Sequence, residues 1–262
     1  MKKHILTGIL VLLAVGSVGY ANIVTFQMSY FIPRAQSGGQ YVDSLWTVEF
    51  ENMNFKRTNF EDASFGIFYE IALTNQFSLV LGLDTYSKNR TGYYMDYVGY
   101  TIENQDWAFP SAMYYSNFTP QHNFSVSITP IQASLKFTPF GRRHFIIPYV
   151  GGGIALYFSR IRLRGDMIDF SDEYVYTDDA GGETSIYPIY YVDAWEEGST
   201  FGKISFGWQV FGGFMVPVTS RISIDAGVKY ASSRVKLGQA FEGFGLFDLG
   251  SYQISLGVNY WF

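Results

Sequence analysis

The chain contains no cysteine, which excludes a disulfide-stapled secreted domain, a thiolate metal site and lipid attachment at an N-terminal cysteine. Histidine is scarce as well, with three residues in 262, so the commonest general base of enzymes is nearly missing. The formal net charge is −5, which argues against a nucleic-acid partner. After residue 21 no apolar run approaches the ~20 residues of a membrane-spanning helix. If the chain after residue 21 crosses a membrane, it must therefore cross with β-strands.

The first 21 residues have the three parts of a signal peptide. Lys2 and Lys3 precede an apolar run from Ile5 to Gly16, and small residues lead to Ala21. This run is several residues too short for a retained transmembrane anchor. We expect cleavage after Ala21, which leaves 22–262 as one exported domain.

The last segment of the chain alternates strictly between apolar and polar side chains. Its apolar residues are Tyr252, Ile254, Leu256, Val258, Tyr260 and Phe262. Because successive side chains of a strand point to opposite faces, one face suits lipid and the other suits a barrel lumen. Seven further segments alternate in the same way, within 24–32, 65–73, 77–84, 124–137, 146–158, 203–216 and 222–230. Aromatic residues, 19% of the chain, fit the interfaces of such a barrel with lipid.

Short and long connections between these segments alternate along the whole chain. The short ones are 74–76, 139–144 and 217–220, and the long ones are 34–62, 87–123, 165–200 and 236–248. Outer-membrane barrels have short periplasmic turns and long extracellular loops. Unpaired strand edges cannot face hydrocarbon, so the sheet must close. The sequence predicts an all-β fold, a transmembrane antiparallel up-and-down barrel of about eight strands in the cell outer membrane.

Two segments depart from this pattern. In the fourth strand the apolar positions change phase at Pro130, from Phe124, Val126 and Ile128 to Ile131 and its alternate neighbours. A phase change at proline predicts a β-bulge, which either adjusts the curvature of the strand or forms a lateral opening in the wall. Residues 45–55 have strand-like side chains within the first long loop, and we expect an extracellular extension there.

Two sequence motifs resemble a known group of barrels. The terminal Val258-Asn259-Tyr260-Trp261-Phe262 looks like the C-terminal signal read by the bacterial barrel-assembly machinery, with Tyr260 and Phe262 as its aromatic residues. The segment Ile147-Pro148-Tyr149-Val150-Gly151-Gly152-Gly153-Ile154 resembles a strand of outer-membrane protein W-like barrels, and the preceding strand carries Pro130. The resemblance implies an eight-stranded barrel that gives small hydrophobic molecules passive passage across the outer membrane. The alternative is a closed-lumen barrel whose extracellular loops bind a partner.

Candidate sites follow from these strand phases. Six charged residues are predicted to face the lumen, as a network that plugs it or as a charged constriction: Glu70, Asp84, Lys136, Lys203, Asp225 and Lys229. Three arginines are predicted to face outward above the apolar section, where guanidinium groups can hold lipopolysaccharide phosphate or pair with loop acids: Arg160, Arg162 and Arg164.

The loops and histidines offer weaker candidates. Six tyrosines of the second loop can bind a partner or pack the loops together: Tyr93, Tyr94, Tyr97, Tyr100, Tyr114 and Tyr115. The acidic third loop has no EF-hand spacing for calcium, and we expect no metal or cofactor. His122 and Ser125 fall on opposite faces of an ideal strand, and His144 lies in a periplasmic turn. We therefore expect no enzyme, and outer-membrane lipid, lipopolysaccharide and an apolar solute as partners.

Overall fold

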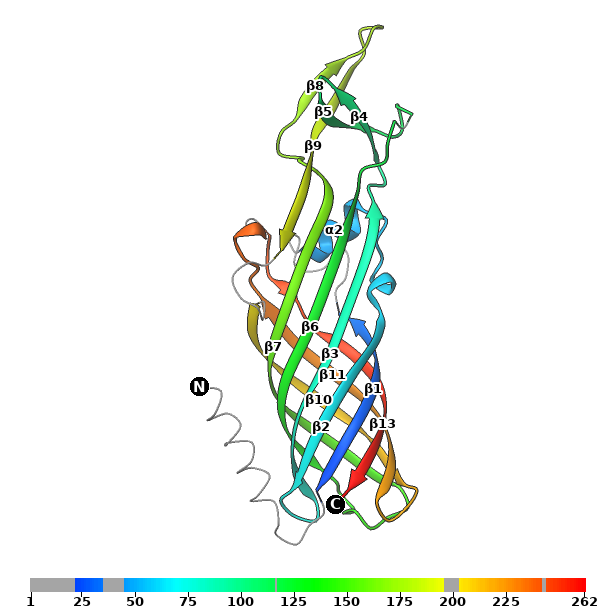
Figure 1. The fold of residues 1–262 in the computed structure, drawn as a ribbon, viewed down its shortest axis with the longest axis vertical. Helices are drawn as coiled ribbons and strands as arrows, with labels where there is room; N and C mark the ends of the chain where they lie inside the picture. The colour runs from blue at the N-terminus through cyan, green and yellow to red at the C-terminus, as the bar shows by residue number, and fades with distance from the viewer. Residues whose placement is uncertain (1–21, 35–44, 116, 196–202, 242–243) are drawn as a thin grey trace.

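A computed structural model describes residues 22–34, 45–115, 117–195, 203–241 and 244–262, so the predicted signal peptide lies outside the described residues. The molecule is a β-barrel with a tall extension at one end (Figure 1). The barrel strands are β1 (Ile23–Pro33), β2 (Asp62–Ala72), β3 (Phe77–Tyr93), β6 (Gln121–Phe137), β7 (Ile147–Ile168), β10 (Lys203–Pro217), β11 (Ile222–Val235) and β13 (Ser251–Trp261).

Each barrel strand pairs antiparallel with the next, and β13 pairs with β1 to close the sheet. The first and last described residues meet at the closure, where Asn22 and Phe262 exchange two backbone hydrogen bonds of 3.0 Å. The predicted eight-stranded up-and-down barrel is confirmed. The short turns lie at the end that holds this closure, which is the periplasmic end.

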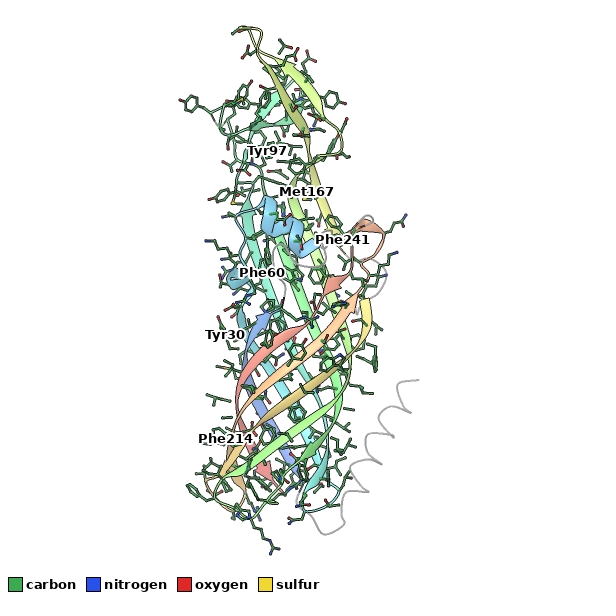
Figure 2. The ribbon with its side chains drawn as sticks, turned by 180° about the vertical axis from the view of Figure 1, so that it is seen from behind. Tyr30, Phe60, Tyr97, Met167, Phe214 and Phe241 are labelled. Atoms are coloured by element: carbon green, nitrogen blue, oxygen red, sulfur yellow. The ribbon has the colours of Figure 1, made fainter. Side chains whose placement is uncertain are left out.

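The predicted apolar faces of the strands point outward. Phe26 on β1, Phe65 on β2 and Leu256 on β13 are 58%, 59% and 64% exposed, and Tyr30 and Phe214 lie on the outer surface (Figure 2). We call this ring of outward apolar side chains the lipid belt. A closed barrel inside such a belt has all backbone groups paired and its apolar face toward hydrocarbon. The chain is an outer-membrane β-barrel.

No helix in the described part of the chain is long and apolar enough to cross a bilayer.

The predicted bulge at Pro130 is absent. Even-numbered residues of β6 point inward along its whole length, and its register with β7 is constant from His122↔Gly165 to Phe137↔Val150. The apolar residues change face because their surroundings change. Below Pro130 the outside is lipid, whereas above it Phe124 and Val126 enter an apolar interior and are fully buried.

The long loops contain regular structure. The second and third loops form a small sheet from β4 (Tyr97–Ile102), β5 (Gln105–Pro110), β8 (Tyr174–Thr177) and β9 (Glu183–Trp195), which joins the upper end of β7 through β9. We call it the apical sheet; it stands above the barrel in Figure 1.

The predicted strand-like extension at 45–55 is wrong. Residues Leu45–Asn52 form helix α2, followed by the short helix η1 (Arg57–Phe60). The side chains of Leu45, Trp46 and Glu49 are buried, and α2 lies over the barrel mouth (Figure 1). In the fourth loop, the short helix η2 (Gln239–Phe241) and strand β12 (Phe247–Asp248) complete the mouth.

Candidate functional site

The periplasmic end of the lumen is closed by a buried group of charged side chains. Glu70 on β2 accepts hydrogen bonds from Lys136 Nζ at 2.9 Å, from Arg142 Nη2 at 2.8 Å and from Ser78 Oγ at 2.6 Å. Across the lumen, the hydroxyl of Tyr149 donates to Asp225 at 2.8 Å. Lys136 Nζ lies 4.1 Å from the ring centre of Tyr149, which joins the two pairs. We call these residues the lower charge cluster.

A second ion pair crosses the lumen higher up. Lys229 on β11 contacts Asp84 on β3, and both side chains are less than a tenth exposed. The structure therefore brings together five of the six predicted lumen charges in two groups. The sixth, Lys203, lies half-buried at the start of β10 and forms no ion pair with any residue the structure describes.

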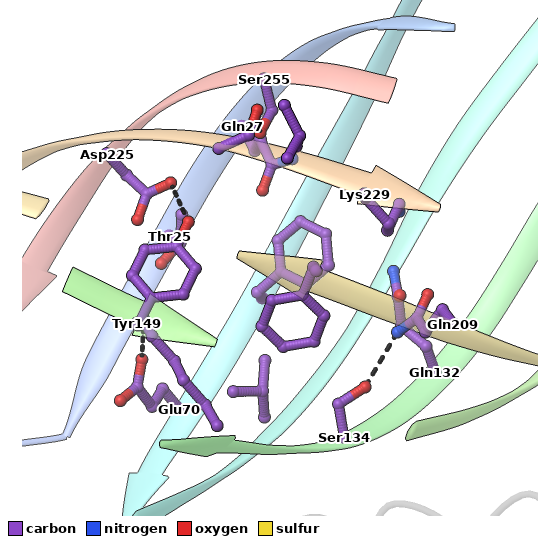
Figure 3. Close-up of a pocket in the computed structure, with 16 residues that line it drawn as sticks. Thr25, Gln27, Glu70, Gln132, Ser134, Tyr149, Gln209, Asp225, Lys229 and Ser255 are labelled. Atoms are coloured by element: carbon purple, nitrogen blue, oxygen red, sulfur yellow. Dashed lines mark hydrogen bonds and ion pairs between the residues drawn. The ribbon is translucent and has the colours of Figure 1, made fainter. Parts of the chain in front are cut away.

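Between these groups the lumen narrows to a small cavity of about 60 Å³ (Figure 3). All eight barrel strands contribute to its lining, with Gln27, Gln132, Gln209, Tyr149 and Lys229 among the side chains that point inward. Gln209 Nε2 donates to Ser134 Oγ at 2.9 Å. A second cavity of about 10 Å³ lies above it beside Pro130. The first cavity has room for a few water molecules and the second for one at most, because a water needs roughly 10 to 15 Å³.

The extracellular end of the barrel is closed by apolar packing. Trp46 on α2 contacts the rings of Phe60, Phe124 and Phe247 at centroid distances of 4.9 to 5.1 Å. Trp46 Nε1 also donates to the backbone oxygen of Asp248 at 3.0 Å. We call α2 and these aromatic rings the mouth plug. It buries large rings against each other from four separate segments of the chain.

One buried polar pair fixes the plug to the wall. His122 Nε2 lies 2.6 Å from Glu49 Oε2, and the side chains are 1% and 2% exposed. The other ring nitrogen of His122 lies 3.3 Å from the backbone oxygen of Asp166.

Next to the pair, burial raises the pKa of the Tyr94 phenol. At the outer rim, a hydrogen bond from Lys88 lowers the pKa of Asp62.

The apical sheet has its own core and an exposed aromatic surface. Phe109 is 3% exposed and packs against Tyr100, Tyr114 and Tyr176. Of the six tyrosines singled out in the second loop, Tyr94 is buried and Tyr97, Tyr100 and Tyr114 are half-buried, whereas Tyr93 and Tyr115 are 48% and 93% exposed. Tyr190 and Tyr191 of β9 add 46% and 66% exposed side chains.

The three arginines of β7 lie on the outer face, with Ile161 and Leu163 between them pointing inward. Arg162 donates from Nε and Nη2 to Asp193 of β9 at 2.9 Å each. Arg164 Nε lies 3.8 Å from the same carboxylate and donates to the hydroxyl of Tyr191 at 2.9 Å. Two of these arginines are thus held by β9.

The other candidates lie apart from the lumen. His144 is exposed in its periplasmic turn, and Ser125 faces outward while His122 faces inward. Tyr260 and Phe262 are 43% and 57% exposed at the periplasmic end, with ring centres 6.4 Å apart. No group of three acidic or histidine side chains within the described ranges is placed to hold a metal ion.

Several contributors to the two closures were not predicted from the sequence, among them Arg142, Trp46 and Glu49. Arg142 lies in a turn, where strand alternation says nothing of its direction. Trp46 and Glu49 lie on α2, whose apolar side chains are also typical of a strand. The spacing of Leu45, Glu49 and Asn52 by four and three residues was a helical signal, but it is short and includes polar side chains.

No protein-family model and no curated protein sequence matches the chain. Solved structures similar to it include the outer membrane protein OprG from Pseudomonas aeruginosa, with a TM-score of 0.45 and 11% identity over 93% of this chain and 96% of that one. Neisserial surface protein A has a TM-score of 0.41 and 14% identity over 93% and 97% of the two chains. Ail, the attachment invasion locus protein of Yersinia pestis, solved in complex with the heparin analogue sucrose octasulfate, has a TM-score of 0.37 and 11% identity over 92% and 97%.

Proposed function

We propose that this protein acts at the cell surface, as a closed barrel that holds a binding surface on its apical sheet. This proposal rests on the closure of the lumen at two levels. The lower charge cluster spans the lumen from β2 and β6 to β11, and the mouth plug fills the opposite end with packed rings. A continuous pore needs both to move, and buried ion pairs are costly to break because each separated charge stays without a partner.

The apical sheet supplies the surface that such a function requires. It is joined to the barrel by β7 and β9, so its position is set by backbone pairing rather than by a flexible loop. Tyr191 on β9 and Val175 on β8 are 66% and 65% exposed, and Tyr115, in the connection that follows β5, is 93% exposed. Rigid aromatic side chains of this kind are enriched in protein interfaces, since they contribute large contact areas at a small entropic cost.

Two measurements test the proposal. In planar bilayers, the purified barrel should show no steady single-channel openings. Cells that display the protein should attach to other cells more than cells without it, and Tyr115→Ser with Tyr190→Ser should remove the gain. Phe145→Ser is the matched control, because Phe145 is 79% exposed in a periplasmic turn. Steady openings of the native barrel, or attachment unaffected by the tyrosine changes, would contradict the proposal.

A second candidate is the passage of small apolar molecules through the wall at Pro130. The pairing of β3 with β6 stops at Leu83↔Ile131 and resumes at Tyr86↔Ile128, because Pro130 has no backbone N–H to donate. The 10 Å³ cavity lies on the inner side of this gap. The gap in the ladder supports a lateral opening here.

Pro130→Val tests this route without a change of register, since the register is already continuous. The variant should regain the missing backbone pair and fold at least as stably. If the gap passes apolar solutes, their uptake by cells should fall. Undiminished uptake through a correctly folded variant would exclude the opening.

A further inference from the structure

The outer face of β3, β6 and β7 above the lipid belt carries polar side chains in regular rows. The strand registers place one residue of each strand side by side, and in each row β3 and β6 contribute a hydroxyl or an amide while β7 contributes a guanidinium. The rows are Ser87, Ser127 and Arg160, then Asn89, Ser125 and Arg162, then Thr91, Asn123 and Arg164. Successive rows are about 6.8 Å apart, because outward residues alternate along a strand.

These rows form a groove on the outside of the wall. Short side chains on β3 and β6 stand beside long side chains on β7, and the hollow has a volume of about 790 Å³. Ser87, Ser125, Ser127, Thr129, Arg160 and Arg162 line it. The polar lining is therefore built by backbone pairing rather than by chance contacts of mobile loops.

The lower end of the groove merges into the lipid belt. Ile131 and Phe158 line the groove itself. Ile131 is 52% exposed and pairs with Leu83 on one side and Leu156 on the other, which are 46% and 47% exposed. The groove thus begins where hydrocarbon ends and continues upward over hydroxyl and guanidinium groups. This is the level at which lipid headgroups lie.

The guanidinium groups are oriented but not hidden. Arg162 donates two hydrogen bonds to Asp193, which fix the plane of its guanidinium. The side chains of Arg162 and Arg164 remain 40% and 58% exposed, and Arg160 is exposed as well. The contacts of Arg162 and Arg164 with β9 hold these two planar groups against the outer face, which lowers the entropy lost on binding an anion.

We infer that this groove binds the phosphorylated sugar headgroup of an outer-leaflet glycolipid. Guanidinium groups donate paired hydrogen bonds to phosphate, and the rows of serine, threonine and asparagine can bond sugar hydroxyls. The apolar lower end points to a lipid rather than a soluble sugar phosphate, because it would contact the first carbons of the acyl chains. The site extends the three arginines expected to contact lipopolysaccharide into a groove with a defined polar lining.

The probe for this site is lipopolysaccharide, titrated onto the barrel refolded in a zwitterionic detergent. Ser127→Gln fills the groove without a change of charge, and Arg160→Gln removes one guanidinium. Arg160→Gln should weaken binding about tenfold, as expected for the loss of a charge-assisted hydrogen bond, and Ser127→Gln should weaken it because the longer side chain occupies the space of the headgroup. Arg221→Gln, at an exposed arginine of the periplasmic turn, should bind like the native barrel. Heat-modifiable gel migration checks that each variant is folded.

A second titration with the deacylated, water-soluble headgroup distinguishes the source of the phosphate. Intact lipopolysaccharide should bind at least tenfold more tightly than this headgroup, because only the lipid reaches Ile131 and Phe158. Equal binding of the two would overturn the lipid assignment. Unchanged binding by folded Ser127→Gln and Arg160→Gln would overturn the site. Neither result affects the surface function, whose tests concern tyrosines of the apical sheet and conductance through the lumen.

Discussion

Two adjacent arginines in one periplasmic turn have different surroundings. The side chain of Arg142 is 8% exposed and paired with Glu70, and it lies 5.9 Å from the ring centre of Trp261, whereas Arg143 is exposed. Arg142→Gln should lower the free energy of unfolding by about 3 kcal/mol, because Glu70 loses a buried partner. Arg143→Gln should change it by less than about 0.5 kcal/mol. Urea unfolding in lipid vesicles measures both, and equal losses would contradict the assigned closure.

Val228 tests the outward phase of β11. Its side chain is 60% exposed in the lipid belt, so Val228→Arg should cost about 2 to 4 kcal/mol of folding free energy. Val228→Leu, which keeps an apolar side chain toward lipid, is the control and should be nearly neutral. A similar stability of the two variants in the same unfolding experiment would mean that Val228 does not face lipid.

Residue positions in the wall were predictable, but several contacts were not. Alternation alone placed Glu70 and Val228 on opposite sides of the wall. Alternation also places Gly227 on the lumen side, where a Cβ would lie 2.7 Å from the Tyr149 hydroxyl that bonds Asp225. This close approach involves a residue of β7 that is distant in the sequence, so no local pattern contains it.

At the scale of elements, α2 depends on one tryptophan for its place in the mouth. Trp46→Ala should cost about 3 to 5 kcal/mol locally, because it leaves a cavity among Phe60, Phe124 and Phe247. The amides of α2 should then exchange hydrogen faster while those of β11 keep their protection. Glu51→Ala is the control, since Glu51 is exposed on the same helix. Unchanged exchange of α2 in Trp46→Ala would show that the mouth plug is held elsewhere.

The errors at element scale have one physical origin. Alternation reports which side chains share a face, but not what lies on either side of that face. In β6 the sequence pattern reversed at Pro130 because the strand leaves the lipid, and the register stayed constant. In residues 45–55, the aromatic side chains are compatible with one face of a strand and equally with the buried side of a short helix.

At the scale of the whole molecule, assembly is predicted to depend on the final residue. Phe262 is 57% exposed and its ring centre lies 6.1 Å from that of Tyr69, which continues the apolar ring of the barrel at its seam. Phe262→Asp should block insertion, so that cells contain only the form that migrates identically with and without boiling. Phe140→Asp is the control, because Phe140 is 67% exposed in a periplasmic turn. Folded Phe262→Asp protein in normal amount would refute the assembly signal.

The reversal of polarity along β6 has a thermodynamic consequence. Above Pro130, unfolding exposes Phe124, Val126 and the rings around them to water, which raises the heat capacity. Below Pro130, the outward apolar side chains already contact lipid in the folded barrel. Unfolding there exposes mainly the polar groups of the lumen, and exposure of polar groups lowers the heat capacity. The stability of the upper part should therefore curve with temperature like that of a water-soluble domain and pass through a maximum. The stability of the lower part should depend instead on the bilayer around it. Cooling should therefore weaken the mouth plug before it weakens the wall.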